Sequence, residues 1–218
     1  MIRHGAVASA LALLCFVAVA SEARATVVVL HGLEEMTRKS EVIVHARVAA
    51  QRVQKEEGRI VTLTDIEVLD GLKGAKVGET LTIYQVGGSL DGARQWIEGA
   101  HEYEIGEEMV LFAVRHKERI VSYGVGVGKF RVIYDGAFRR VVEDLHGVVE
   151  MKRSETGEVS MGSPVPRTFP SLEALKQEVR AYVARGDLPR VMKNERRAIG
   201  PAGKAQLKPA PKSVEGGR

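Results

Sequence analysis

Apolar and polar residues alternate with a period of two through most of the middle of the chain. Between Val42 and Val48 every second residue is small or β-branched and apolar, and residues 60–69 repeat the pattern with valine, isoleucine and threonine. A period of two is typical of a strand with one buried face, because alternate side chains point to opposite faces. Runs of this kind predict seven strands, at residues 42–48, 60–69, 81–84, 109–114, 120–123, 130–134 and 138–142.

Short turn signals containing glycine separate the predicted strands. The pair Asp135-Gly136 is the strongest hairpin signal, because both residue types tolerate a positive φ. No long helical pattern interrupts the runs. Several short strands with glycine-rich turns predict a mainly β fold, either an antiparallel barrel or a sandwich. Of these we favour a small antiparallel barrel of about seven strands.

A short helical pattern precedes the strands. Leu30, Leu33 and Met36 follow one another at intervals of three between Thr26 and Ser40. This spacing predicts one short N-terminal helix with a single apolar side.

A second helical pattern follows the strands and predicts a C-terminal amphipathic helix. Ser171 can cap it, Gly186 can end it and Pro189 cannot continue it. Its apolar side consists of Leu172, Leu175, Val179, Tyr182 and Val183. We expect this side to pack on the barrel, and binding to a partner is the alternative.

The first 25 residues have the three parts of a secretory signal peptide. Arg3 and His4 precede an uncharged, largely apolar stretch at residues 5–20, which small residues follow. We expect cleavage after Ala25, with Ala20 as the alternative. The stretch is shorter than the about 20 apolar residues of a membrane span. The sequence therefore predicts a secreted or periplasmic protein that does not span the membrane.

The only cysteine, Cys15, lies in this apolar stretch and would be removed with it. Leu14 precedes it, where a lipidated cysteine would follow a small residue. We therefore expect a mature protein without lipid and without cysteine, whose folded part is large enough to do without disulfides.

Positive charge is concentrated at the two ends of the chain. The 218 residues carry a formal charge of +4, of which residues 1–25 hold +1 and residues 187–218 hold +5, so that residues 26–186 hold −2. The C-terminal segment also has four of the seven prolines and no aromatic residue. It cannot bury enough apolar surface to offset the entropy of ordering, which predicts a solvated basic tail. Attraction of this tail to an anionic envelope surface is the sharper hypothesis.

The chain is thus expected to have three parts: a signal peptide at 1–25, a β-barrel domain with its C-terminal helix at 26–186, and the tail at 187–218. Nucleic acid is not an expected partner, because the middle part is weakly acidic and aromatic residues make up only 5% of the chain.

No complete catalytic, metal or cofactor motif is present in the sequence. There is no Gly-x-Ser-x-Gly turn, and no pair of histidines has helical i, i+4 spacing. The run Gly124 to Lys129 differs from a nucleotide-binding loop, because Phe130 follows the lysine where Ser or Thr is required. Glycine at every second position of this run instead predicts a strand face without side chains, where the sheet bends or another element packs closely.

The loop that starts at Gly87-Gly88 is the best candidate for a recognition surface. It is rich in glycine, lies between predicted strands and carries Asp91, Arg94 and the only tryptophan, Trp96. Loops on a rigid scaffold are where binding residues concentrate. The alternative is that Trp96 folds back as a lid over one mouth of the barrel.

Five runs together resemble a widespread group of exported bacterial proteins of uncharacterised function: residues 33–40, 42–48, 64–74, 87–88 and 103–112. The pattern of that group is a short helix, a strand ending in Gly-x-Val, a strand leading into Leu-Lys-Gly, a double glycine, and Phe-x-x-Gly-Glu-x-x-Val-Leu-Phe. This chain has Ala46 where glycine is usual and Tyr103 where phenylalanine is usual.

The order of the predicted strands also resembles the OB-like barrels of netrin-type and tissue-inhibitor-type modules. Those modules carry disulfides, and the inhibitors have a metal-chelating N-terminal cysteine, whereas the mature part of this chain has no cysteine. The resemblance therefore implies an OB-like fold and export, and does not imply protease inhibition by that mechanism.

These observations favour an exported, non-enzymatic binding or structural module that contacts a protein or an envelope component through its loops. The alternative is an envelope-acting hydrolase or metal-dependent enzyme. Its site would be assembled from distant residues such as His45, Asp91, His101 and Glu107.

Overall fold

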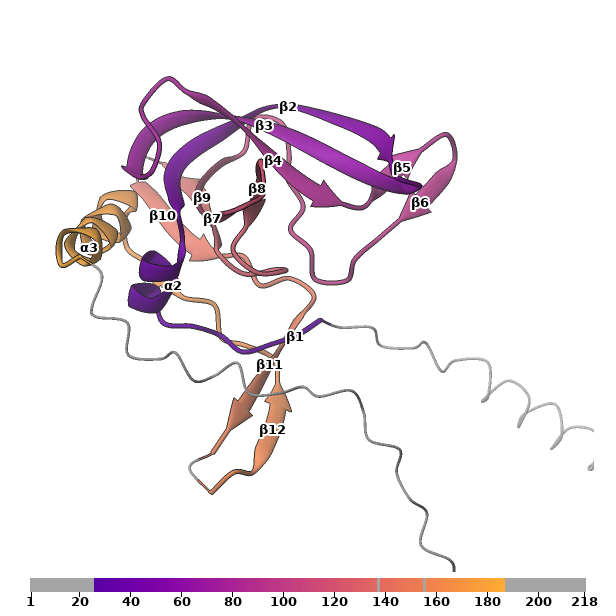
Figure 1. Ribbon diagram of the computed structural model, residues 1–218. Helices are drawn as coiled ribbons and strands as arrows, with labels where there is room; N and C mark the ends of the chain where they lie inside the picture. The colour runs from indigo at the N-terminus through magenta and orange to yellow at the C-terminus, as the bar shows by residue number, and fades with distance from the viewer. Residues whose placement is uncertain (1–25, 137, 155, 187–218) are drawn as a thin grey trace, which may run out of the picture. The chain divides into compact units, whose positions relative to one another are not determined.

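Strands make up most of the part of the chain that the structure describes. The computed structural model describes residues 26–186 except 137 and 155 (Figure 1). The predicted signal peptide and the predicted basic tail lie outside these residues. The strands are β1 (Thr26–Val28), β2 (Val42–Glu56), β3 (Arg59–Lys73), β4 (Thr80–Val86), β5 (Gly88–Leu90), β6 (Ala93–Gln95), β7 (Glu108–His116), β8 (Arg119–Ser122), β9 (Lys129–Asp135), β10 (Phe138–Glu143), β11 (Val148–Arg153), β12 (Val159–Gly162) and β13 (Thr168–Phe169). The helices are α2 (Leu33–Lys39) and α3 (Leu172–Ala184).

The mainly β fold is confirmed, and each of the seven predicted strands lies at one of the strands β2, β3, β4, β7, β8, β9 and β10. The expected number of about seven is wrong, because the described residues contain thirteen strands. The additional ones are two to six residues long. Four of them, β1, β5, β6 and β13, have only two or three residues, which is too short for a period of two to be recognised.

Five strands of the main sheet pair in a ring. The order β7-β2-β3-β4-β8 returns to its start, because β8 also pairs with β7. The pairing of β4 with β8 is parallel and consists of one residue pair, Ile83 with Ile120. The ring is therefore not a closed barrel, and we call its weakest junction the seam. Strands β9, β10 and β13 extend the sheet beyond β7.

Two apolar clusters lie on opposite faces of this sheet. One lies inside the ring and includes Val44, Ile66, Ile83 and Leu111, all of them buried. The other lies between the sheet and the two helices, which contact each other on the same side of the sheet (Figure 1). Strand alternation explains both clusters, because neighbouring residues of β2 and β7 point to opposite faces.

Helix α3 confirms the predicted C-terminal amphipathic helix. The side chain of Ser171 accepts a hydrogen bond from the amide of Ala174 at 3.1 Å, which caps the helix. The apolar side, with Leu172, Leu175 and Val179 buried, packs on the sheet as expected. Within residues 26–186, neither α2 nor α3 has the length and apolar composition of a membrane-spanning helix.

The N-terminal helix is shorter than predicted. Residues 26–28 form strand β1, which pairs in parallel with β11, and α2 begins only at Leu33. The reason is the β-branched run Thr26-Val27-Val28-Val29, which fits a strand better than a helix. Strands β1, β11 and β12 form a separate three-stranded sheet.

The glycine run 124–128 is a loop and not a strand, which corrects the prediction for this segment. Gly124, Gly126 and Gly128 all have left-handed φ angles of 65°, 71° and 91°. The expected close approach is confirmed at Gly126, where a Cβ atom would overlap the carbonyl oxygen of Gly99. Only glycine combines this φ with this contact.

Candidate functional site

The predicted recognition residues lie on and beside the hairpin β5–β6. Asp91 and Gly92 form its turn, with φ angles of 50° and 77°. The guanidinium carbon of Arg94 lies 5.1 Å from the ring centroid of Trp96, a cation–π contact. The structure thus brings Arg94 and Trp96 together, whereas Asp91 lies at the turn.

The base of this hairpin is fixed to the ring. The side-chain oxygen of Gln95 accepts a hydrogen bond from the amide of Ile60 at 2.8 Å, and the hydroxyl of Thr62 donates to the carbonyl of Gly87 at 2.7 Å. A Cβ atom on Gly88 would lie 2.6 Å from the same hydroxyl. The hairpin is therefore a loop held at a defined place on β3.

Tyr103 and His101, and not Trp96, fill the end of the ring next to the hairpin. Tyr103 is buried in the cluster inside the ring, and its carbonyl accepts a hydrogen bond from Gln51 at 2.9 Å. Gln85 donates to the carbonyl of His101 at 2.9 Å. Trp96 stays 42% exposed, so part of its surface is available to solvent or to a ligand.

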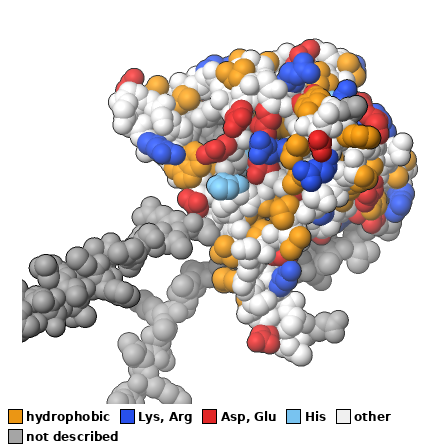
Figure 2. Space-filling model, turned by 180° about the vertical axis from the view of Figure 1, so that it is seen from behind, with side chains coloured by type: hydrophobic (Ala, Val, Ile, Leu, Met, Phe, Trp, Pro, Cys, Tyr) orange, Lys and Arg blue, Asp and Glu red, His pale blue; other side chains and the backbone are white. Residues whose placement is uncertain are grey.

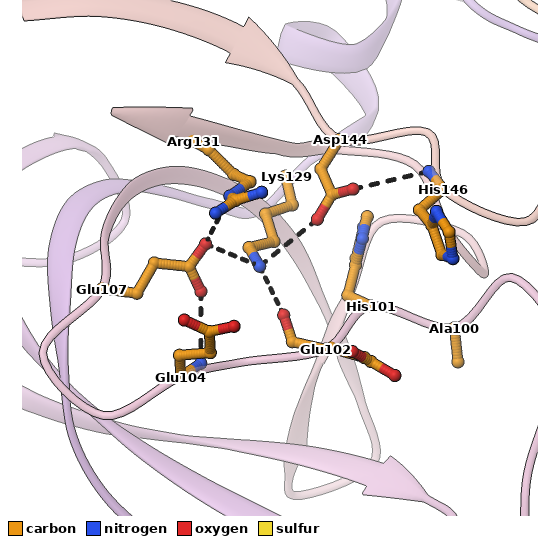
Figure 3. Close-up of a pocket in the computed structure, with 9 residues that line it drawn as sticks. All are labelled: Ala100, His101, Glu102, Glu104, Glu107, Lys129, Arg131, Asp144 and His146. Carbon is orange, nitrogen blue, oxygen red and sulfur yellow. Dashed lines mark hydrogen bonds and ion pairs between the residues drawn. The ribbon is translucent and has the colours of Figure 1, made fainter. Parts of the chain in front are cut away.

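Three hollows surround the segment from Trp96 to Glu107. The charged cavity, of about 250 Å³, is lined by Ala100, His101, Glu102, Glu104, Glu107, Lys129, Arg131, Asp144 and His146 (Figure 3). The Trp96 cavity, of about 280 Å³, lies between that segment and the ends of β2, β3 and β4, and its lining includes Gln51, Thr62, Gly88 and Trp96. The seam groove, of about 370 Å³, is lined by Tyr84, Gln85, Val86, Ile97, Ala100, His101, Val114, Val121, Ser122, Gly124, Val125 and Gly126.

Lys129 is the centre of the charged cavity. Its buried ammonium group lies 2.9 Å from the Oε1 atom of Glu107 and 3.3 Å from the Oδ2 atom of Asp144, and it also donates to the carbonyl of Glu102 (Figure 3). Arg131 Nε lies 3.2 Å from the same Glu107 oxygen. Each of the three N–H groups of the Lys129 ammonium thus has one acceptor, and the acceptors are Glu107, Asp144 and the carbonyl of Glu102.

The second oxygens of both carboxylates are also engaged. Glu107 Oε2 accepts a hydrogen bond from the amide of Glu104 at 3.3 Å, and Asp144 Oδ1 accepts one from the amide of His146 at 3.4 Å. A network whose members all have partners fixes the loops that carry them. The charged cavity therefore has the organisation of a structural ion cluster.

His101 lies at the boundary of all three hollows. Its Nε2 atom lies 3.0 Å from the carbonyl oxygen of Val127, to which it donates. Burial lowers the pKa of His101 from 6.5 to about 4, so the imidazole is neutral near pH 7.

The residues of the alternative enzyme site are brought together only in part. His101 and Glu107 both line the charged cavity, whereas Asp91 lies in the hairpin turn and His45 contacts Glu108 at 2.7 Å. Within the described residues there is no group of three or more His, Cys, Asp or Glu side chains placed to hold a metal ion.

The contact between the buried side chains of His45 and Glu108 is the centre of a polar cluster that the sequence did not indicate. The Tyr134 hydroxyl donates to Glu108, and Arg47 and Arg139 lie 3.5 and 3.8 Å from its carboxylate. Burial acts to raise the pKa of Glu108, but the hydrogen bonds from Tyr134 and His45 outweigh it and the pKa falls below 4.5. Burial also lowers the pKa of His45, more than Glu108 raises it.

The cluster thus holds a buried carboxylate anion beside a neutral imidazole. Glu107 and Glu108 are adjacent in the chain, yet one faces the charged cavity and the other His45. Strand β7 begins at Glu108, so Glu107 precedes the strand and Glu108 belongs to it. The two carboxylates therefore have different partners although they are neighbours in the sequence.

Charge is mixed on the face of the molecule that Figure 2 shows. Figure 2 shows acidic, basic and hydrophobic side chains interspersed over the face seen from behind. This face has the mixed pattern of an ordinary protein surface and not the single-sign pattern that steers a highly charged ligand.

Comparison with models of protein families, with curated proteins and with solved structures finds no match for this chain.

Proposed function

We propose that the protein is an exported, non-enzymatic binding module and that the hairpin β5–β6 with Trp96 is its recognition surface. The observation that carries the proposal is the exposure of Trp96, the only tryptophan, at the rim of a cavity of about 280 Å³. Tryptophan and arginine are the residue types that most often dominate the energy of binding interfaces. Here they lie in contact on a hairpin that the ring holds in place.

The scaffold proposed for this module is an OB-like barrel. The ring order β7-β2-β3-β4-β8, with a meander of three strands and one parallel junction, supports this assignment. An OB-fold is a five-stranded, partly open Greek-key barrel. The single residue pair at the seam fits the partly open form.

The partner is proposed to be a protein or another component of the cell envelope, because the N-terminal 25 residues have the pattern of a signal peptide. Polar groups of Gln51, Thr62 and Gln85 line the cavity beside Trp96. A ligand with both an apolar face and hydrogen-bonding groups suits this lining.

Trp96 provides a direct test, because it is the sole source of tryptophan fluorescence. The protein without its first 25 residues is titrated with peptidoglycan fragments, anionic phospholipid vesicles and detergent-extracted envelope proteins. We expect one of these to shift the emission of Trp96, and Arg94→Ala to weaken that binding about tenfold. Arg153→Ala, at an exposed position in β11, is the matched control and should leave binding unchanged. Unchanged emission with every fraction, or equal binding by both arginine variants, refutes the proposal.

The tail at 187–218 is proposed to add electrostatic attraction to an anionic surface, because it holds a charge of +5. A chain ending at Gly186 should then sediment less with anionic vesicles at low salt, and the difference should disappear at high salt. Equal sedimentation of both chains at every salt concentration excludes this role.

A further inference from the structure

The seam leaves part of one strand edge without a partner strand. Among the described residues, the pairing of β4 with β8 ends after Ile83 and Ile120, although β4 continues to Val86. The amide of Gly87 donates to the carbonyl of Ile60. Together with the register of β3 and β4, this hydrogen bond shows which residues near the end of β4 direct their backbone groups toward β3. Because backbone groups alternate in direction along a strand, those of Val86 point away from β3 and toward the seam.

The seam groove adjoins this edge. Tyr84, Gln85 and Val86 line one of its sides, and Val121 with the loop 124–126 lines the other. The loop contributes accessible backbone at Gly124, which is exposed and has no side chain, and at Val125, which is 43% exposed, whereas Gly126 is buried. The groove therefore lies between an incomplete strand ladder and a second stretch of backbone.

The lining of the groove contains no Asp, Glu, Lys or Arg side chain. Its single titratable group with a pKa near neutrality in free solution, His101, is held neutral by burial. The adjoining charged cavity, in contrast, is lined by four carboxylates and two basic side chains. An occupant without charge matches the groove, since charged groups there would lose hydration without gaining a partner.

We propose that the seam groove binds an extended, uncharged polypeptide segment of a partner protein, which adds as a strand along Tyr84–Val86 of β4. Strand addition supplies partners for backbone groups that the ring leaves without a ladder, and the apolar side chains of the groove receive alternate side chains of the segment. A lipid chain would contact the same apolar side chains but would provide no hydrogen bonds to the edge of β4. The unfinished strand edge is thus the feature that favours a polypeptide.

This inference does not depend on the recognition surface at Trp96. It rests on the pairing of β4 with β8 and on the lining of the groove, and it holds if the hairpin binds nothing. Arg94→Ala should weaken the binding at Trp96 described above and leave the binding of a strand at the seam intact.

The probe is a synthetic uncharged peptide of alternating threonine and valine, acetylated and amidated at its ends, added to the protein with its tail present. A peptide with proline at every second position is the control, because proline lacks the amide needed for pairing. We expect the exchange of the Val86 amide hydrogen, followed by NMR, to slow about tenfold on saturation with the first peptide and to stay unchanged with the second.

Two valine variants locate the binding site. Val125→Asp places a charge in the groove and should weaken binding of the peptide about tenfold, whereas Val77→Asp, at a position that is 68% exposed and outside the groove, should leave it unchanged. Circular dichroism checks that both variants are folded. The proposal is overturned if the Val86 amide exchanges at the same rate with and without peptide, or if both variants bind equally. It is also overturned if the amide is already protected in the free chain, or if a fatty acid competes with the peptide and no amide becomes protected.

Discussion

Gly126 is the position where a single methyl group should disturb the fold most clearly. Its Cβ atom in an alanine variant would lie 2.7 Å from Cγ2 of Val148 and would overlap the carbonyl oxygen of Gly99, a backbone atom that cannot rotate away. Gly126 also has a φ of +71°, which costs an L-residue about 1–2 kcal/mol. Overpacking adds about 1–3 kcal/mol. We therefore expect Gly126→Ala to lower the free energy of unfolding by about 2–5 kcal/mol.

The variant Gly92→Ala separates the cost of the left-handed φ from the cost of overpacking. Its φ of +77° is nearly the same, but a Cβ atom there would meet nothing within 4 Å. Gly92→Ala should therefore cost only the backbone term of about 1–2 kcal/mol. In urea denaturation followed by circular dichroism, Gly126→Ala should unfold at clearly lower urea concentration than Gly92→Ala. In a thermal scan, a difference of about 2 kcal/mol corresponds to about 4–8 °C for a domain of this size. Equal stability of the two variants would refute the argument that the carbonyl of Gly99 leaves no room for a side chain at residue 126.

The remaining predictions concern the buried ion cluster, a titrating histidine and a helix cap. Lys129→Met should lower the free energy of unfolding by about 3–5 kcal/mol, because two carboxylates lose their buried partner. Lys152→Met removes an ion pair whose lysine is 68% exposed, and it should change the free energy of unfolding by about 1 kcal/mol at most. Equal effects of the two variants would show that burial of the ion pair does not matter. The pKa of His101 in the folded chain, about 4, lies below its ordinary value of 6.5. As the pH falls, the unfolded chain therefore binds the proton before the folded chain does. The free energy of unfolding should fall by about 3 kcal/mol between about pH 6.5 and about pH 4. His101→Gln should lack this part of the pH dependence in urea titrations, and an identical pH profile would contradict it. Ser171→Ala should cost about 1 kcal/mol through loss of the cap on α3, whereas Ser160→Ala in an exposed strand should be neutral in the same assay.

The strands could be predicted where an extended run has one buried face. β2, β3 and β7 have enough alternating residues for the period to be visible, and Ser171 marks the start of α3 by its side-chain chemistry. Strand β1 was predicted as part of a helix, because the spacing of Leu30, Leu33 and Met36 was extended too far toward the N-terminus. Its pairing with β11, about 120 residues later in the chain, leaves no local signal.

The candidate site was predictable only in its composition. A glycine-rich loop that carries Asp91, Arg94 and Trp96 is visible in the sequence, but the contact between Arg94 and Trp96 and the anchoring of Gln95 on β3 are not. The histidines show the same limit. His45 and His101 were considered as members of one site, and the structure places one against Glu108 and the other against Val127.

The sequence by itself determined the mainly β class, the terminal helix and the candidate hairpin, because these follow from periodicity, capping and turn chemistry within a few residues. The tertiary structure alone decided the incomplete junction of β4 with β8, the partners of Lys129 and the approach of Gly99 to Gly126. Each of these joins segments that are far apart in the chain. Such contacts depend on how the sheet curves and pairs, and no local spacing of residues records that.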